Sequence, residues 1–150
     1  MSADDVFQIA NLVAIAGWLV LLVSPWIPVW SDRIAGLFVP GLLAVAYVAT
    51  IAWFWGEQTP LYGQTVSTPG FDSLEGVAAL LGTREALAAG WIHYLAFDLF
   101  VGAWETRDAR RRAIPFWTVV PCLVFTFVSG PFGLLLYLML RTWRGRPAWR

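Results

Sequence analysis

The stretch GWIHYLAFDLFVGAWE, residues 90–105, decides the fold, because it is long, almost entirely apolar and contains no proline. A helix needs about 20 predominantly apolar residues to cross the hydrocarbon core of a bilayer. Thr83 is a residue type that caps helix N-termini, so we expect this helix to run over residues 84–105. The stretch is therefore predicted to be a transmembrane helix.

Three more apolar runs surround it, and we expect membrane helices over residues 6–23, 34–55 and 114–140. Pro40 predicts a kink near the start of the second of these helices. Pro115, Pro121 and the sequence SGPFG at 129–133 interrupt the last run, which leaves a single kinked crossing or a turn back at the break. We favour the single crossing, because a run of this length fits one tilted helix.

Composition supports a membrane as the solvent, since 59% of the 150 residues are apolar and 13% are charged. A soluble domain carries roughly 25% charged residues. The fold class is therefore all-α: a polytopic membrane protein with a bundle of about four transmembrane helices, formed by a single domain over residues 1–150. The polar segment 56–83 contains the capping-box sequence 72–75, which predicts a short interfacial helix on the membrane surface.

The net charge and the numbers of cysteine and histidine residues limit the kinds of partner that the chain can bind. The net charge is zero, so we expect no nucleic-acid partner. One cysteine, Cys122, and one histidine exclude an internal disulfide and a multi-histidine metal centre, and we expect no metal and no cofactor.

Asp4 and Asp5 precede the first apolar run, unlike the basic start of a signal peptide. We expect an integral protein of a bacterial cytoplasmic membrane without a cleaved signal peptide. Arginine counts leave the orientation tied, with five on each side.

His93 and Asp98 are the ionisable residues inside the apolar span of the helix over residues 84–105, where a charge costs ~2.5–3.5 kcal/mol. They are five residues apart, about 140° around a helix, so each needs a partner from another helix. His93 shares a face with Phe97, Phe100 and Trp104. Asp98 shares a face with Trp91 and with Glu105, which we interpret as a solvated carboxylate at the helix end. A structural hydrogen bond for His93 and an interhelical clamp for Asp98 are alternatives to a functional role.

Four motifs together carry a family resemblance: FDSLEGV at 71–77, WIHYLAFDLFVG at 91–102, IPFW at 114–117 and GPFGLLLY at 130–137. Over most of its length the chain resembles the ABA DEFICIENT 4-like family of small membrane proteins. That family takes its name from a plant plastid protein needed for the conversion of violaxanthin to neoxanthin. The resemblance implies a carotenoid or another isoprenoid lipid as the substrate class.

The leading hypothesis is a carotenoid isomerase-like or carotenoid-handling membrane protein. Asp98 and His93 are the candidate catalytic residues: Asp98 would be the proton-transfer or polar anchoring group, with His93 as its counterpart. Substrate-binding residues would line an aromatic groove, namely Trp91, Tyr94, Phe97, Phe100, Trp104 and Asn11. The alternatives are a non-enzymatic helper subunit of a larger membrane enzyme and a small oligomeric transporter with Asp98 in its pore. We expect membrane lipid and an isoprenoid ligand as partners, together with a second copy of the chain or a larger membrane enzyme.

Overall fold

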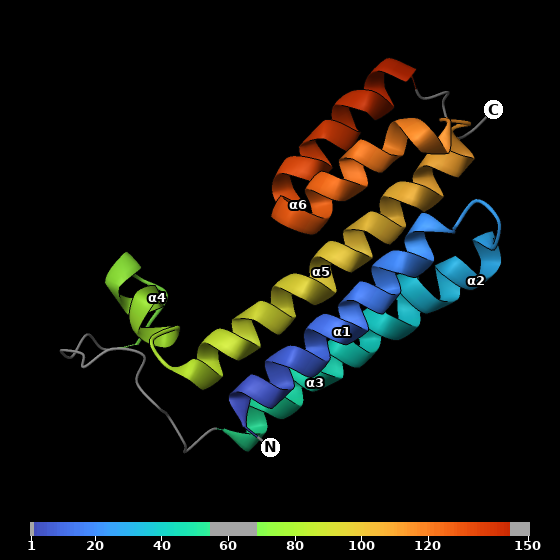
Figure 1. Cartoon of the computed structure of the whole chain (residues 1–150). Coiled ribbons are helices and arrows are strands. Elements are labelled where there is room, and N and C mark those ends of the chain that lie inside the picture. The colour runs from blue at the N-terminus through green and yellow to red at the C-terminus, as the bar shows by residue number, and fades with distance from the viewer. Residues whose placement is uncertain (1, 55–68, 145–150) are drawn as a thin grey trace.

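The computed structural model describes residues 2–54 and 69–144, and in these ranges it consists of helices joined by short turns (Figure 1). Four segments are long and apolar enough to cross a membrane: Ala3–Leu22, Pro28–Trp53, Arg84–Arg111 and Phe116–Arg144. The expected all-α membrane bundle is therefore confirmed. The elements in chain order are α1 (Ala3–Leu22), α2 (Pro28–Arg33), the π-helical turn η1 (Ile34–Phe38), α3 (Val39–Trp53), α4 (Leu74–Leu80), α5 (Arg84–Arg111) and α6 (Phe116–Arg144).

Side-chain caps begin α5 at the predicted Thr83 and α4 at Ser73, which replaces the capping box predicted over residues 72–75. The Oγ1 atom of Thr83 accepts a hydrogen bond from the Ala86 N–H at 3.2 Å, and the Oγ atom of Ser73 accepts one from the Gly76 N–H at 3.0 Å. These bonds satisfy backbone donors that a helix start leaves free. Helix α5 continues six residues past the expected end at 105, because its last turn carries arginines that complement the helix dipole.

The second membrane segment begins earlier than expected, at Pro28, and its helix α3 ends at Trp53. The kink predicted at Pro40 takes the form of the π-helical turn η1 just before it. Proline has no N–H, and its ring crowds the carbonyl four residues earlier, so a wider turn accommodates it. Residues 55–68, which hold most of the expected surface segment 56–83, lie outside the described ranges, as do the tail residues 145–150.

Helix α5 lies in the middle of the bundle and contacts α1, α3 and α6 (Figure 1). Its Ile92 and Leu99 side chains are fully buried in the apolar core. The ring of Trp18 on α1 packs against Gly102. A Cβ on Gly102 would lie only 2.7 Å from this ring, so a larger residue does not fit there without a shift of the ring. Close packing of this kind, through small residues, is how membrane helices associate. The central position of α5 brings most of the candidate residues of the chain to its interfaces.

Helix α6 reverses direction at Ser129, where φ is −155° and ψ is 71°. Before the break, the Val128 carbonyl lies beside Tyr94, and after it Tyr137 and Arg141 lie beside Asp108. The chain thus runs along α5 towards its N-terminal half and then returns, as Figure 1 shows. Each arm is roughly 20 Å long, shorter than a hydrocarbon core of about 30 Å.

The single kinked crossing favoured from the sequence is therefore wrong, and the turn back at the break is the observed alternative. Gly130 weakens the helix, and Pro131 removes a backbone donor from the turn that follows. Gly133 then lies directly against Thr126, since a Cβ on Gly133 would overlap the Thr126 backbone. Because the motif GPFG combines these residues, the chain can fold back tightly at this point.

The reversal also gathers the arginines at one end of the bundle, which we call the arginine end. It comprises Arg33, Arg107, Arg110, Arg111, Arg112, Arg141 and Arg144, and the two aspartates Asp32 and Asp108 lie there as well. Of the described residues, Arg84 lies at the other end with Asp4, Asp5, Asp72, Glu75 and Glu85. The tie in arginine counts disappears, and the positive-inside rule predicts that the arginine end is cytoplasmic.

Candidate functional site

Helix α5 presents its polar residues on two different sides. Asp98 and Glu105 are buried where α6 packs, whereas His93, Phe97 and Phe100 are exposed on the side nearer α3. Asp98 and His93 therefore do not form one site, which agrees with their separation of about 140° around the helix. The predicted residues fall into separate groups along α5.

Asp98 lies at the bend of the α6 hairpin and is 8% exposed. Its carboxyl group lies against Gly130, the first residue of the returning arm. The position of a Cβ on Gly130 would coincide with the Asp98 carboxyl group, so only glycine permits this contact. The start of a helix carries free N–H groups and a partial positive charge. Asp98 therefore places a buried carboxyl group beside the start of the second arm of α6.

Tyr94 completes this arrangement, one helical turn before Asp98 on α5. Its hydroxyl donates a hydrogen bond of 2.9 Å to the Val128 carbonyl, at the end of the first arm of α6. Backbone groups inside a bilayer need such partners, because no water is available to them. We call Tyr94 and Asp98 the hairpin clamp, since they bind the two helix ends that the reversal creates.

Glu105 is completely buried, so its interpretation as a solvated carboxylate at the helix end is wrong. The first arm of α6 packs against it. Its Oε1 atom accepts a hydrogen bond from the Thr126 hydroxyl at 3.0 Å, while Glu105 Oε2 and Asp98 Oδ2 are buried without a hydrogen-bond partner. Each of these carboxyl groups can carry a proton or accept a bond from a ligand hydroxyl. Ionisable groups at membrane depth commonly have such uses.

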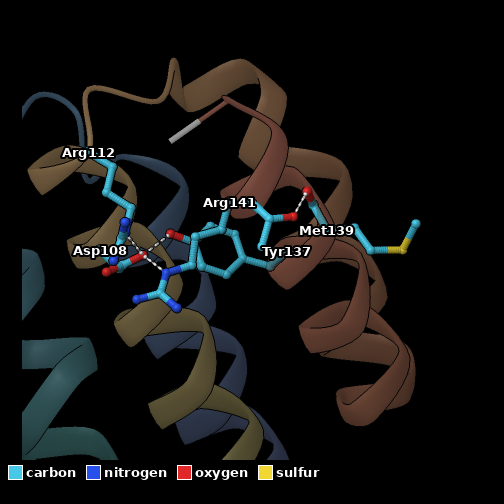
Figure 2. Close-up of polar contacts among 6 residues, drawn as sticks. Asp108, Arg112, Tyr137, Met139 and Arg141 are labelled. Carbon is cyan, nitrogen blue, oxygen red and sulfur yellow. Dashed lines mark hydrogen bonds and ion pairs between the residues drawn. The ribbon is translucent and has the colours of Figure 1, made fainter. Parts of the chain in front are cut away.

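Asp108 joins the two helices near the arginine end (Figure 2). Its Oδ2 atom accepts a hydrogen bond from the Tyr137 hydroxyl at 2.8 Å and pairs with Arg112 at 2.8 Å and with Arg141 at 2.9 Å. Arg141 also lies 5.7 Å above the ring of Trp104. This network holds the returning arm of α6 against α5, and it is structural because its polar groups satisfy one another.

His93 belongs to an aromatic group on the opposite side of α5. Its ring stacks on Phe97 at 4.5 Å between centroids and lies 5.7 Å from the ring of Tyr47 on α3. The imidazole is exposed on the surface that faces the membrane. It can therefore donate a hydrogen bond to a ligand that approaches from the lipid.

An apolar groove of about 330 Å³ runs between α5 and the segment η1–α3, next to this aromatic group. One wall is made of small residues and the other of aromatic rings. The lining residues are Gly36, Leu37, Pro40, Gly41, Ala44, Ala96, Phe97 and Phe100. We call it the lipid-facing groove, because Leu37, Phe97 and Phe100 in its walls are exposed.

The other predicted binding residues lie apart from this groove. Trp91 donates a hydrogen bond of 3.0 Å to Asn11 on α1 and stacks on Tyr94 at 5.3 Å. Trp104 packs edge-on against Tyr137 at 5.4 Å, near the arginine end. Phe97 and Phe100 are thus the two predicted binding residues that share the lipid-facing groove.

Sequence reasoning missed the burial of Glu105 and the roles of Asp108 and Tyr137. The spacing of Asp98 and Glu105, seven residues apart on one helix face, is a signal that both could face the same partner helix. No comparable spacing in the sequence indicated a role for Asp108, because its partners Tyr137 and Arg141 come from the returning arm of α6. Within residues 2–54 and 69–144 no three His, Cys, Asp or Glu side chains come together as a metal site.

Comparisons with known proteins agree with the motifs. A family model described as ABA DEFICIENT 4-like matches residues 5–137. Protein ABA DEFICIENT 4, chloroplastic, from Arabidopsis thaliana is 24% identical over 140 residues. This alignment covers 93% of the chain and 61% of the relative, so the chain spans about three fifths of that protein's length. No solved structure matches the chain.

Proposed function

The chain belongs to the ABA DEFICIENT 4-like family, and from this premise we propose that it binds a carotenoid or another long isoprenoid lipid in the lipid-facing groove. Carotenoid is the substrate class that the family resemblance implies. Location in a bacterial cytoplasmic membrane remains a prediction, because the matched relative is named as chloroplastic. The proposal concerns the binding of this lipid, and isomerase-type catalysis is a separate prediction.

The shape of the lipid-facing groove carries this proposal. A polyene is a stiff, flat and apolar chain, and it needs an elongated surface without protruding side chains. Gly36, Gly41 and Ala44 form a shallow wall on η1 and α3, and the rings of Phe97 and Phe100 form the wall on α5. Apolar and aromatic linings of this kind are typical of sites for small apolar ligands. The opening towards lipid allows a ligand to enter from the bilayer.

His93 supplies a polar group beside this groove, since its ring stacks on the groove residue Phe97. Carotenoids with hydroxyl or epoxide end groups carry oxygens that accept a hydrogen bond from an imidazole N–H. Tyr47, beside His93, is three residues from the groove residue Ala44 on α3. We assign His93 to recognition of an oxygenated end group.

Asp98 has a different place in this proposal from the one that the sequence suggested. It contacts the α6 hairpin, away from His93, so a joint acid–base step by these two residues has no support from the geometry. Asp98 acts here as a positioning residue that holds α6 against α5. Isomerase-type activity stays a prediction.

The experiment is expression in a carotenoid-producing bacterium, purification in mild detergent, and chromatography of the bound pigments. We expect wild type to retain pigment and Ala44→Phe to lose it, because the new ring would fill the groove. Val45→Phe is the matched control, since Val45 is 65% exposed and does not line the groove. A rearranged pigment in the wild-type extract would add catalysis to binding.

A colourless, well-folded wild-type preparation would overturn the proposal. Equal pigment in the Ala44→Phe and Val45→Phe variants would overturn the placement in the groove. A larger membrane enzyme that copurifies with a pigment-free chain would instead support the helper-subunit alternative. Circular dichroism of each variant checks that the helices are intact.

A further inference from the structure

The arginines of the arginine end differ in their partners. Arg110 pairs with Asp32 at 2.5 Å, and both Arg112 and Arg141 pair with Asp108. In the part of the chain that the structure describes, Arg33, Arg107 and Arg111 have no carboxylate partner. Arg144 at the end of α6 has none either, so four positive charges of the described arginine end lack a carboxylate partner, and three of them, Arg33, Arg107 and Arg111, lie on α2 and α5.

These three side chains come from two elements that lie side by side. The guanidinium of Arg107 is 3.0 Å from the position of a Cβ on Gly36 in η1, and Arg33 is three residues before Gly36. Arg111 follows Arg107 by one helical turn on α5. We call Arg33, Arg107 and Arg111 the arginine corner. Like charges at such spacing repel one another, so an anion bound between them would be stabilising.

Aromatic residues around the corner indicate the depth at which it lies. Arg33 lies 5.9 Å from the centre of the Trp30 ring, and Trp26 and Trp30 are 69% and 60% exposed. Exposed tryptophans at a helix end are typical of the membrane–water interface, where the lipid phosphates are found. The positive-inside rule places this end in the cytoplasm, where the leaflet is rich in anionic lipids.

We propose that the arginine corner binds the phosphate headgroup of an anionic phospholipid of the cytoplasmic leaflet. Guanidinium groups bind phosphate oxygens through paired N–H donors, and Arg107 is half-buried, so its side chain is already held in place. Gly36 also lines the lipid-facing groove, so the headgroup lies at one mouth of that groove. The bound lipid is distinct from the carotenoid ligand, and either proposal can fail without the other.

The test uses the purified chain in nanodiscs of phosphatidylcholine that contain a small fraction of phosphatidylglycerol. Native mass spectrometry measures how much phosphatidylglycerol stays bound to the protein. We expect enrichment of this lipid on wild type, and roughly fivefold weaker retention for Arg107→Gln, since one arginine near the surface contributes about 1 kcal/mol. Arg84→Gln removes the same charge at the opposite end and is expected to retain the lipid as wild type does.

Three further measurements complete the test. Arg111→Gln provides a second variant if Arg107→Gln fails to fold, and it should weaken retention in the same direction. Ala44→Phe should leave phosphatidylglycerol retention unchanged, which separates the corner from carotenoid binding. Equal loss in Arg84→Gln and Arg107→Gln would overturn the proposal, as would complete displacement of the lipid by millimolar inorganic phosphate, which would mean a site for soluble anions.

Discussion

The interface between α1 and α5 is held in its middle by close apolar packing, with polar contacts of Asp4 and Asn11 nearer one end, whereas the interface between α5 and α6 has hydrogen bonds and ion pairs along its length. In the first, Gly17 packs against Leu99, and Gly102 packs against Trp18. In the second, α6 is fixed through the hairpin clamp, the Glu105–Thr126 bond and the network at Asp108. The two sides of one helix thus use different interactions.

The cause of this difference is the continuity of the helices. Helix α1 is unbroken, so its backbone groups bond to one another and need no partner from α5. Helix α6 is interrupted at Ser129, and its free backbone groups need polar partners at membrane depth. Helix α5 supplies these partners from Tyr94 and Asp98. A reversal inside a membrane therefore requires polar side chains on the neighbouring helix.

The largest expected effect concerns the side of the membrane on which the C-terminal end of α6 lies. A cysteine there is labelled from one side or from the other, so the result is all or none. In a Cys122→Ala background, single cysteines would be introduced by Arg111→Cys, Thr142→Cys and Ser73→Cys. We expect a membrane-impermeant maleimide to label the first two from the cytoplasmic side and the third from the other side. Labelling of Thr142→Cys from the same side as Ser73→Cys would mean that α6 crosses the membrane.

Glycine-to-alanine substitutions compare how closely the two arms of the α6 hairpin pack with how closely α1 packs against α5. A Cβ on Gly133 would overlap the backbone of Thr126, so we expect a loss of about 3 kcal/mol or more in the free energy of unfolding. Gly102→Ala meets the Trp18 ring, which has more room to move, and should cost about 1–2 kcal/mol. Gly41→Ala meets no atom within 4 Å and should be neutral or stabilising by up to about 1 kcal/mol.

Denaturant titration in mixed micelles, followed by circular dichroism, measures this series. The reverse order for Gly133 and Gly102 would contradict the assignment of the tightest contact to the α6 hairpin. Equal losses at all three positions would mean that alanine acts through detergent effects and not through packing.

Substitution of Asp98 tests the hairpin clamp and has a smaller expected effect than Gly133→Ala. Asp98→Ala removes the carboxyl group that lies against Gly130 and should cost about 1–3 kcal/mol, because the free N–H groups at the start of the returning arm lose the buried acceptor beside them. Asp98→Asn keeps an acceptor oxygen and should cost less than half as much. The same titration measures both variants, with limited proteolysis at the bend as a second probe. If both variants unfold as wild type does, Asp98 has no capping role.

Much of the fold follows from local sequence features. The apolar runs predict helices at the right places, and the capping sequence 72–75 and Thr83 predict two helix starts, both of which are confirmed, the first with Ser73 as the capping residue. For the candidate site, the sequence identified Asp98 and the aromatic stripe of Phe97 and Phe100, but it placed Glu105 in solvent. The burial of Glu105 depends on Thr126, which lies 21 residues away and reaches it only after α6 has formed.

The sequence by itself determined that the chain is a helical membrane protein, because apolar length and charge depletion act locally, residue by residue. Only the tertiary structure decided that α6 folds back, that the arginines share one end, and that His93 and Asp98 lie apart. The break at Ser129 is compatible with a kink or a reversal, and the choice depends on polar partners from α5. Contacts between distant residues settle such a choice, and no local pattern encodes them.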